Sequence, residues 1–442
     1  MNKLEQKIST NNLIRFAIPT IISIVFTNIY SSIDGIFVAR FIGTDALSSV
    51  NIVWPLLSIL IGVGFMFGMG GTALIAKKLG ENNAQEAKEN FSLITLTAFI
   101  TSIILSIALF TYRSDLLLFF GANNHLFGLC MEYMQPLLIM LPFIVTGFMF
   151  QEFFIAVGKP KIGMGLSILG GITNIILDYY LIYTLNMGMN GAAIATGIAF
   201  SVPSIMGLLY FTFNRRNSLY FVRPKFDSHA IIKSMTNGSS EMVTVLSTSL
   251  LVIVMNNILI RLAGSDGIAA VTIIIYMQGI LIGIFLGYSS GIAPIISYNY
   301  GKKDEYKLKK IFSISLTIIS IIAIGSLLIG LFFSNTLVGI FVDPHTNVFK
   351  MASFGFKIAA FAYLFMGFNI FTSVLFTAFN NGKISAILSF LRTFLFLLIL
   401  LLILPGIFGV NGVWYAMPLA ELCAIMVTIY TLNKFKTNYK YA

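Results

Sequence analysis

Long and almost uninterrupted apolar runs follow one another along this chain of 442 residues, from Leu13 to Leu432, and they limit the possible folds. Many of them reach the roughly 20 residues that a helix needs to cross the hydrocarbon layer of a bilayer. Only 10% of the residues are charged, too few to cover a soluble protein of this length. Because hydrocarbon offers the backbone no water, such runs cross it as helices. The sequence therefore predicts an all-α integral membrane protein.

The polar interruptions between the apolar runs divide the chain into predicted transmembrane helices. We count twelve of them, with boundaries uncertain by roughly 2–4 residues. Their ranges are 13–38, 46–76, 90–112, 126–156, 161–184, 190–213, 231–261, 267–298, 310–333, 351–379, 384–404 and 411–433.

The formal net charge of +11 is distributed unevenly between the two sides of the predicted helices. One side, which holds both termini, carries 23 of the 28 Lys and Arg residues, Lys383 and Arg392 among them. An excess of this kind marks cytoplasmic loops, so both termini are expected in the cytoplasm of a multi-pass protein of the cell membrane. Since topology accounts for the charge, we expect no nucleic-acid partner. The five basic residues of the other side are Arg40, Arg113, Arg261, Lys350 and Lys357.

The chain contains an internal repeat with an offset of 221 residues. Residues 40–92 align with 261–313 without a gap and with 15 identities in 53 positions. Further along, the Gly-x-Asn-Gly motif at 188–191 recurs at 409–412. We infer an N-terminal lobe of six helices (1–213), a cytoplasmic linker (214–230) and a C-terminal lobe of six helices (231–442). Parallel repeats of this kind form two pseudo-symmetric bundles, with a substrate path between them and alternating access as the default mechanism.

Several short motifs occur in a fixed order within this frame of twelve helices, and together they resemble the multidrug and toxic compound extrusion (MATE) family of antiporters. The resemblance implies two six-helix lobes that open alternately, outward transport, and amphipathic, often cationic, organic substrates. The motifs are Pro19 with Asp34 fifteen residues later, Gly43-x-Asp45, Gly70-Gly71-x-Ala73, Lys77-Lys78-Leu79-Gly80, Gly158-Lys159-Pro160, Asn174 with Asp178, and Gly188-x-Asn190-Gly191.

Carboxylates inside apolar helices are the strongest candidates for function, because each costs on the order of 3 kcal/mol at a helix centre. Asn174 and Asp178 are four residues apart, so both lie on one face of a helix, where their oxygens suit H⁺ or a hard cation such as Na⁺. The family's cation site, according to the resemblance, matches Asp34, Asn174 and Asp178. Two close carboxylates do not both ionise easily, so the pair would hold a proton. The resemblance further implies that protonation moves a kink at Pro19.

Two structural alternatives compete with this assignment. Asp34 would pair with Arg40 near the outer surface, and Asp178 would cap buried backbone groups. At the 221-residue offset, the three positions of the site correspond to Met255, Leu395 and Ile399 of the second copy. The acids therefore occur in one copy only, which favours a functional role over a structural one. Glu241 lies near the start of its helix, and we assign it no coupling role.

Other polar and aromatic side chains are candidates for a substrate cavity. Glu152, next to Gln151, either binds a cationic substrate or pairs with Lys159 or Lys161. Glu132 and Glu421 are interpreted as structural or interfacial. The aromatic, Met and Gln residues expected beside a central path, each with packing as the competing interpretation, are Tyr30, Tyr276, Met277, Gln278, Tyr288 and Phe371.

The sequence thus favours a secondary active efflux transporter, a monomer surrounded by membrane lipid, that exports small organic compounds in exchange for H⁺ or Na⁺. We expect no metal site and no cofactor besides the coupling ion, and the chain lacks the P-loop that direct use of ATP would need. The alternatives are a lipid-linked oligosaccharide flippase of the same fold and a six-plus-six transporter of the major facilitator type. The chain has no nucleophile motif that would indicate a membrane enzyme. It also has no filter motif that would indicate a passive channel.

Overall fold

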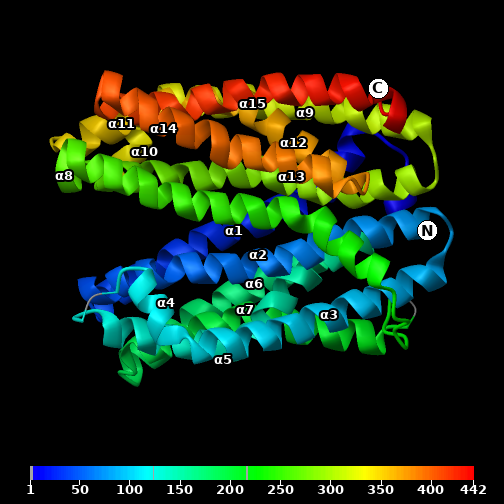
Figure 1. The fold of residues 1–442 in the computed structure, drawn as a ribbon, viewed down its shortest axis with the longest axis horizontal. Helices are drawn as coiled ribbons and strands as arrows, with labels where there is room; N and C mark the ends of the chain where they lie inside the picture. The colour runs from blue at the N-terminus through cyan, green and yellow to red at the C-terminus, as the bar shows by residue number, and fades with distance from the viewer. Residues whose placement is uncertain (1–2, 123, 216–217) are drawn as a thin grey trace.

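The computed structural model describes residues 3–122, 124–215 and 218–442, and almost all of these residues form helices (Figure 1). The first half begins with a short 3₁₀ turn, and its sixth transmembrane helix ends the N-terminal lobe. Its elements are η1 (Lys3–Glu5), α1 (Thr10–Phe41), α2 (Thr44–Gly80), α3 (Ala84–Thr111), α4 (Arg113–Phe119), α5 (Phe127–Ala156), α6 (Pro160–Asp178), the π-helical segment η2 (Tyr179–Thr184) and α7 (Gly188–Phe213).

The second half repeats this plan, again with a π-helical segment in its fifth helix, and has one additional interruption, a 3₁₀ turn. Predicted helix 351–379 contains a 3₁₀ turn, and predicted helix 384–404 contains a π-helical segment. Its elements are α8 (Ser228–Gly301), α9 (Glu305–Phe332), α10 (Ser334–Val338), α11 (Asn347–Ala359), η3 (Ala360–Ala362), α12 (Tyr363–Ala378), α13 (Gly382–Phe390), η4 (Leu391–Leu395), α14 (Phe396–Phe408) and α15 (Val410–Tyr439).

Helix α8 accounts for two of the twelve predicted membrane crossings. Within the described residues, eleven helices are long and apolar enough to span a bilayer, and α8 alone contains 74 residues. Its helical geometry breaks at Gly264, whose φ of +61° favours glycine, and the chain reverses there (Figure 1). The two predicted helices 231–261 and 267–298 are the two legs of α8, so the predicted all-α membrane fold is confirmed.

The predicted boundaries differ from the observed ones mainly at the helix ends. Helices α3 and α9 begin six and five residues before their predicted starts, because Asn83 and Asp304 cap their first turns with side-chain hydrogen bonds. Helix α15 continues to Tyr439, beyond the predicted end. The short helices α4 and α10 were not predicted. The linker predicted at 214–230 runs from the end of α7 at Phe213 to Ser228, and its residues 216–217 lie outside the described residues.

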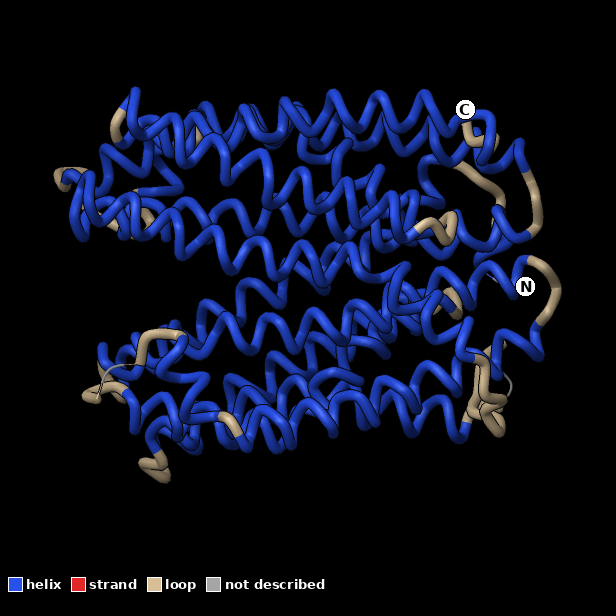
Figure 2. Tube along the Cα trace, in the orientation of Figure 1, coloured by secondary structure: helices blue, strands red, loops and turns tan. Residues whose placement is uncertain are grey.

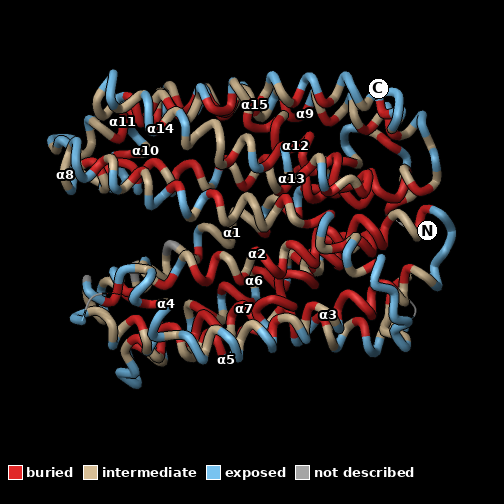
Figure 3. The backbone as a smooth tube through the Cα atoms, in the orientation of Figure 1, coloured by how far each residue is buried: buried red, intermediate tan, exposed pale blue. Residues whose placement is uncertain are grey.

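The helices form two lobes, α1–α7 and α8–α15, which Figures 1 and 2 show one above the other. Both termini lie at one end of the molecule, here called the terminal end, and the backbones of the lobes diverge toward the opposite, far end. Buried residues fill each lobe and the terminal half, where α1 and α2 pack against α8 (Figure 3). This region of contact is called the seam.

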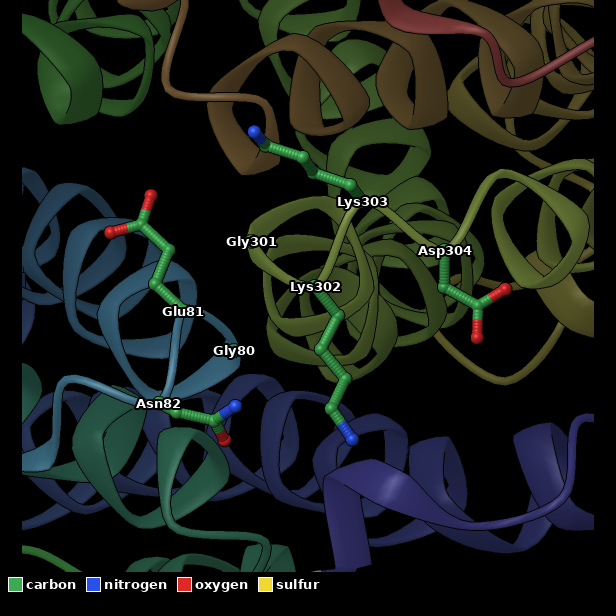
Figure 4. A pocket seen from close by; sticks show the side chains of 7 residues that line it. All are labelled: Gly80, Glu81, Asn82, Gly301, Lys302, Lys303 and Asp304. Carbon is green, nitrogen blue, oxygen red and sulfur yellow. The ribbon is translucent and has the colours of Figure 1, made fainter.

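Equivalent residues of the two repeats meet across the seam. Gly80 lies against the carbonyl of Tyr298, and Gly301 lies against the carbonyl of Lys77, 221 residues before Tyr298. At both glycines an added Cβ would come within 2.2 Å of the opposing carbonyl oxygen, so the backbones touch directly. Figure 4 shows the two helix ends side by side. Residues of both ends line a cavity of about 470 Å³. The contact is therefore pseudo-symmetric, as the repeat predicted.

The chain ends fasten to the turn between α8 and α9 at the same place. Glu5 forms a salt bridge with Lys302, and Glu305 forms one with Lys440 at 2.6 Å. Leu4 beside Glu5 is fully buried. The N-terminal segment of one lobe is thus bound to the other lobe, which adds to the closure of the terminal end.

Candidate cation site

The structure brings the three predicted site residues together inside the N-terminal lobe. Asp34 belongs to α1, while Asn174 and Asp178 lie four residues apart on α6, the helix that packs against α1. The side chain of Asp34 is close enough to interact with those of Asp178 and Asn174. Asn174 and Asp178 are 1% and 0% exposed. The spacing of Asn174 and Asp178 was visible in the sequence. The packing of α1 against α6 adds Asp34 to them.

The oxygens of this cluster have few partners within the protein. Asp34 Oδ1, Asn174 Oδ1 and both carboxylate oxygens of Asp178 are buried without a hydrogen bond among the described residues. Asp178 therefore does not cap backbone groups, and no salt bridge of the described residues joins Asp34 to Arg40. Buried polar atoms without partners are costly, so these oxygens suit a ligand that they can share.

Tyr133 and Thr196 extend the cluster and were not predicted. Tyr133, on α5, is fully buried and close enough to interact with Asp34, Asp178 and Thr196 of α7. Tyr133 Oη and Thr196 Oγ1 also have no hydrogen-bond partner among the described residues. Neither residue stands out in the sequence, because Tyr and Thr are ordinary in membrane helices and only the packing of α5 and α7 aims them here.

A change in helix type occurs next to Asp178. Helix α6 ends at this residue, and the following six residues, Tyr179–Thr184, form the π-helical segment η2. Short π-helical segments inside α-helices are frequent at functional sites, since they redirect side chains and backbone carbonyls. The distortion lies where the sequence predicts cation chemistry.

Oxygen atoms alone form this site, which restricts the ions that it fits. Carboxylate, amide, phenol and hydroxyl oxygens suit a proton or a hard cation such as Na⁺. No group of three or more His, Cys, Asp or Glu side chains with metal-binding geometry occurs in the described part of the chain. The donor set is therefore compatible with the predicted H⁺ or Na⁺.

Glu152 lies in the terminal half of the N-terminal lobe, packed on Gly68 of α2. It is 5% exposed, and its Oε2 has no hydrogen-bond partner among the described residues. The predicted partner Lys159 instead donates from Nζ to Tyr210 Oη at 2.7 Å. The charged side chain that acts on Glu152 is Glu241 of α8, so Glu152 lies where the two lobes meet.

Gln151 and Tyr30 face the interior of the N-terminal lobe. Gln151 Oε1 accepts a hydrogen bond from Ser167 at 2.8 Å, and Ser167 accepts one from Ser23 at 2.6 Å, which links α5, α6 and α1. Tyr30 is 6% exposed and packs near Asp34. Both residues thus border the elements of the cation site in this conformation.

Two of the predicted cavity aromatics are packed inside the C-terminal lobe. Tyr288 is 1% exposed and donates to Ser315 of α9 at 3.0 Å. Phe371 is fully buried, with its ring 6.2 Å from that of Phe312. These contacts agree with the packing interpretation, because both partners belong to α9 of the same lobe.

The remaining predicted cavity residues belong to the second leg of α8. Met277 and Gln278 are both 6% exposed, and Gln278 Nε2 lies 3.5 Å from the sulfur of Met417 within the same lobe. Tyr276 is half-exposed, and its ring is parallel to that of Phe341 at 6.5 Å. Among these, only Tyr276 presents a large exposed surface.

The C-terminal lobe contains a buried ion pair that corrects one assignment. Arg392, predicted on the cytoplasmic side, lies inside the lobe and binds Glu421 at 3.3 Å; their side chains are 13% and 9% exposed. Asn369 donates to Glu421 at 2.7 Å and accepts from Thr428 at 2.7 Å. Arg392 also acts on Glu241. The sequence concealed this pairing because 28 residues separate the two charges, so their contact depends on how α15 packs against η4.

The two halves of the chain both match the model of one known family. A family model described as MatE matches residues 19–180 and again 242–403. The chain belongs to the MatE family. The double match also supports the internal repeat, and the predicted family is confirmed.

Curated relatives of this MatE chain include the multidrug export proteins MepA of Staphylococcus saprophyticus and Staphylococcus aureus (strain MRSA252). They are 24% and 23% identical to it, and each alignment covers 95% of this chain and 93% of the relative. Two solved structures share its fold. An outward-facing multidrug resistance MATE transporter has a TM-score of 0.92, with 22% identity and coverage of 100% and 99%. A MOP superfamily transporter from Pyrococcus furiosus has a TM-score of 0.91, with 20% identity and coverage of 100% and 98%.

Proposed function

We propose that this chain is an antiporter of the cell membrane that exports amphipathic, cationic organic compounds in exchange for H⁺ or Na⁺. The observation that carries the proposal is the meeting of Asp34 and Asp178 in one cluster, in which several buried oxygens have no hydrogen-bond partner among the described residues. Two carboxylates close enough to interact repel each other when both are ionised, so binding of a cation between them is favourable. The names of the curated relatives support export of organic compounds.

Helix α1 connects the cation site to the contact between the lobes. Asp34 lies in its far half, while Ala17 and Ile21 in its terminal half touch the backbones of Gly291 and Gly287 on α8. Pro19 lies between these two contact residues and removes one backbone hydrogen bond of the helix. Cation binding at Asp34 bends α1 at Pro19 in our proposal, and the bend loosens the seam.

The orientation follows from the charges. With Arg392 left out of the count because it is buried in its lobe, 22 basic residues remain on the side of the termini and five on the other. The terminal end then faces the cytoplasm. Because the seam closes that end, the structure corresponds to the state in which the lobes are joined on the cytoplasmic side.

Glu152 is the acid we propose for recognition of a cationic substrate. It lies at the seam, opposite Glu241 of the other lobe, and one of its oxygens is without a partner among the described residues. When the lobes separate at the terminal end, these two carboxylates become accessible from the cytoplasm. A substrate cation then neutralises a pair of negative groups that is expensive to bury.

The test is efflux of a cationic dye from proteoliposomes under an imposed gradient of H⁺ or of Na⁺. We expect one of the two gradients to drive uphill movement of the dye, and Asp178→Asn to abolish the driven part at an equal amount of inserted protein. Dye movement that ignores both gradients would refute antiport. Full activity of Asp178→Asn would refute the site. An insertion control is the comparison of Asp178→Asn with Asp115→Asn, which changes an acid in the short helix α4 outside the cluster.

A further inference from the structure

A second cavity opens at the terminal end of the seam, away from the cation site. Its volume is about 710 Å³. Lys77 of α2 lines it from the N-terminal lobe, and Lys233 of α8 and Lys383 of α13 line it from the C-terminal lobe. Thr236 and Ser239 of α8 complete its polar wall. Three cations thus surround one space, and they come from three different helices.

The cavity is strongly positive. No salt bridge of the described residues involves Lys233 or Lys383, and no acidic residue lines the cavity. Lys77 has Glu81 at 3.7 Å, a length at which the pair is loose and partly exposed. Lys383 belongs to the first turn of α13, where the helix dipole adds partial positive charge. An anion is the ligand that this arrangement favours.

Hydroxyl groups supply directional contacts in addition to charge. Lys233, Thr236 and Ser239 follow each other at intervals of three residues, which places them along one face of α8. The hydroxyls of Thr236 and Ser239 donate to backbone carbonyls of the same helix, at 3.2 and 2.7 Å. Rotation about χ1 would turn these donors toward a bound oxyanion. A phosphate group, with several acceptor oxygens, matches lysines and hydroxyls together.

Exposed apolar side chains on α8 and α13, the helices that carry Lys233 and Lys383, indicate that the phosphate belongs to a lipid. Ile387 and Phe390 follow Lys383 at positions four and seven along the same face of the helix, and they are 49% and 42% exposed. Ile232, next to Lys233, is 60% exposed. A soluble anion gains nothing from these exposed apolar side chains, whereas the acyl chains of a lipid pack against them. Basic pockets at the membrane surface between helices are typical sites of anionic headgroups.

The cavity also depends on the contact between the lobes. Asn380 lines the cavity from the C-terminal lobe and donates to the carbonyl of Ala73 in α2 at 3.2 Å, across the seam. Lys77 moves away from Lys233 and Lys383 whenever the terminal end opens. We propose that this cavity binds the phosphate of an anionic phospholipid headgroup, and that the bound lipid stabilises the state in which the terminal end is closed.

The experiment measures lipid binding to the purified full-length chain in a neutral detergent. Short-chain phosphatidylglycerol, phosphatidylcholine and inorganic phosphate are titrated separately, and bound lipid is counted by native mass spectrometry. The test variant is Lys233→Gln/Lys383→Gln. The matched control is Lys161→Gln/Lys309→Gln, which removes two exposed lysines that do not line the cavity.

We expect phosphatidylglycerol to bind the wild type and the control with equal affinity, and the test variant at least tenfold more weakly. Equal affinity for the test variant and the control would overturn the site. Equal binding of phosphatidylcholine would overturn the role of net charge, and phosphate that displaces phosphatidylglycerol at equal concentration would overturn the assignment to lipid. If the double variant unfolds at a lower temperature than the control without lipid, Lys383→Gln alone provides the comparison, because its side chain is exposed and its removal leaves the packing intact.

Discussion

Gly301→Ala adds a methyl group where the two lobes touch, and it should open the terminal end. The new Cβ would lie 2.2 Å from the carbonyl oxygen of Lys77 and 3.2 Å from its Cα. Ordinary contact requires about 3.4 Å, so the helix ends have to separate by about 1 Å. Both partners are backbone, and no rotamer change relieves the clash. Overpacking of this kind costs about 1–3 kcal/mol.

The cost arises only while the lobes are in contact, so it disfavours the closed state relative to the open one. An energy of about 1–3 kcal/mol corresponds to a shift of about 5- to 150-fold in that equilibrium. A cysteine at Ser234, which is fully buried at the seam, reports the opening through its rate of labelling by a maleimide in inside-out vesicles. The background variant replaces Cys130 and Cys423 by serine.

Gly325→Ala is the control for this experiment, because a Cβ at Gly325 in α9 meets nothing within 4 Å. Gly301→Ala should raise the labelling rate at Ser234→Cys at least fivefold over this control. Equal rates in the two variants would show that the contact at Gly301 does not hold the terminal end closed.

Three further predictions concern other parts of the molecule. Arg392→Met should lower the free energy of unfolding by about 3–5 kcal/mol, because it leaves Glu421 buried without its partner. Arg392→Met/Glu421→Gln should regain most of that stability in a thermal unfolding assay, and equal losses in the two variants would contradict the ion pair. Tyr133→Phe should weaken cation-driven efflux at least threefold at unchanged melting temperature, and wild-type efflux would remove its hydroxyl from the site. A reporter enzyme fused after Lys440 should be active in the cytoplasm, and an external signal would reverse the proposed orientation.

The sequence was sufficient for the parts of the fold that depend on local pattern. Apolar length predicted the membrane crossings, and the 221-residue offset predicted that Gly80 and Gly301 are equivalent. The spacing of Asn174 and Asp178 placed both on one helix face, because helical geometry fixes neighbours four residues apart. Each of these inferences uses the pattern of a single segment or the comparison of two repeated segments.

Contacts between distant segments were beyond the reach of the sequence pattern. Tyr133 joins Asp34 and Asp178 only because α5 packs beside α6, which in turn packs against α1. Arg392 was assigned to the cytoplasmic charges although it lies within predicted helix 384–404, and its pairing with Glu421 of another helix was not visible in the sequence. Such pairings need a partner whose position is set by packing, for which one sequence carries no local signal.

The most direct test of the cation site compares four proteins in the same liposomes: wild type, Asp34→Asn, Asp178→Asn and the double variant. The measurement is the rate of dye efflux driven by the coupling gradient, per molecule of inserted protein. Because both acids act in one binding step, we expect the efflux rate of each single variant to fall at least tenfold. The rate of the double variant should be no lower than that of the less active single variant. Losses that multiply in the double variant would show that Asp34 and Asp178 act in separate steps, and the shared cation site would be contradicted.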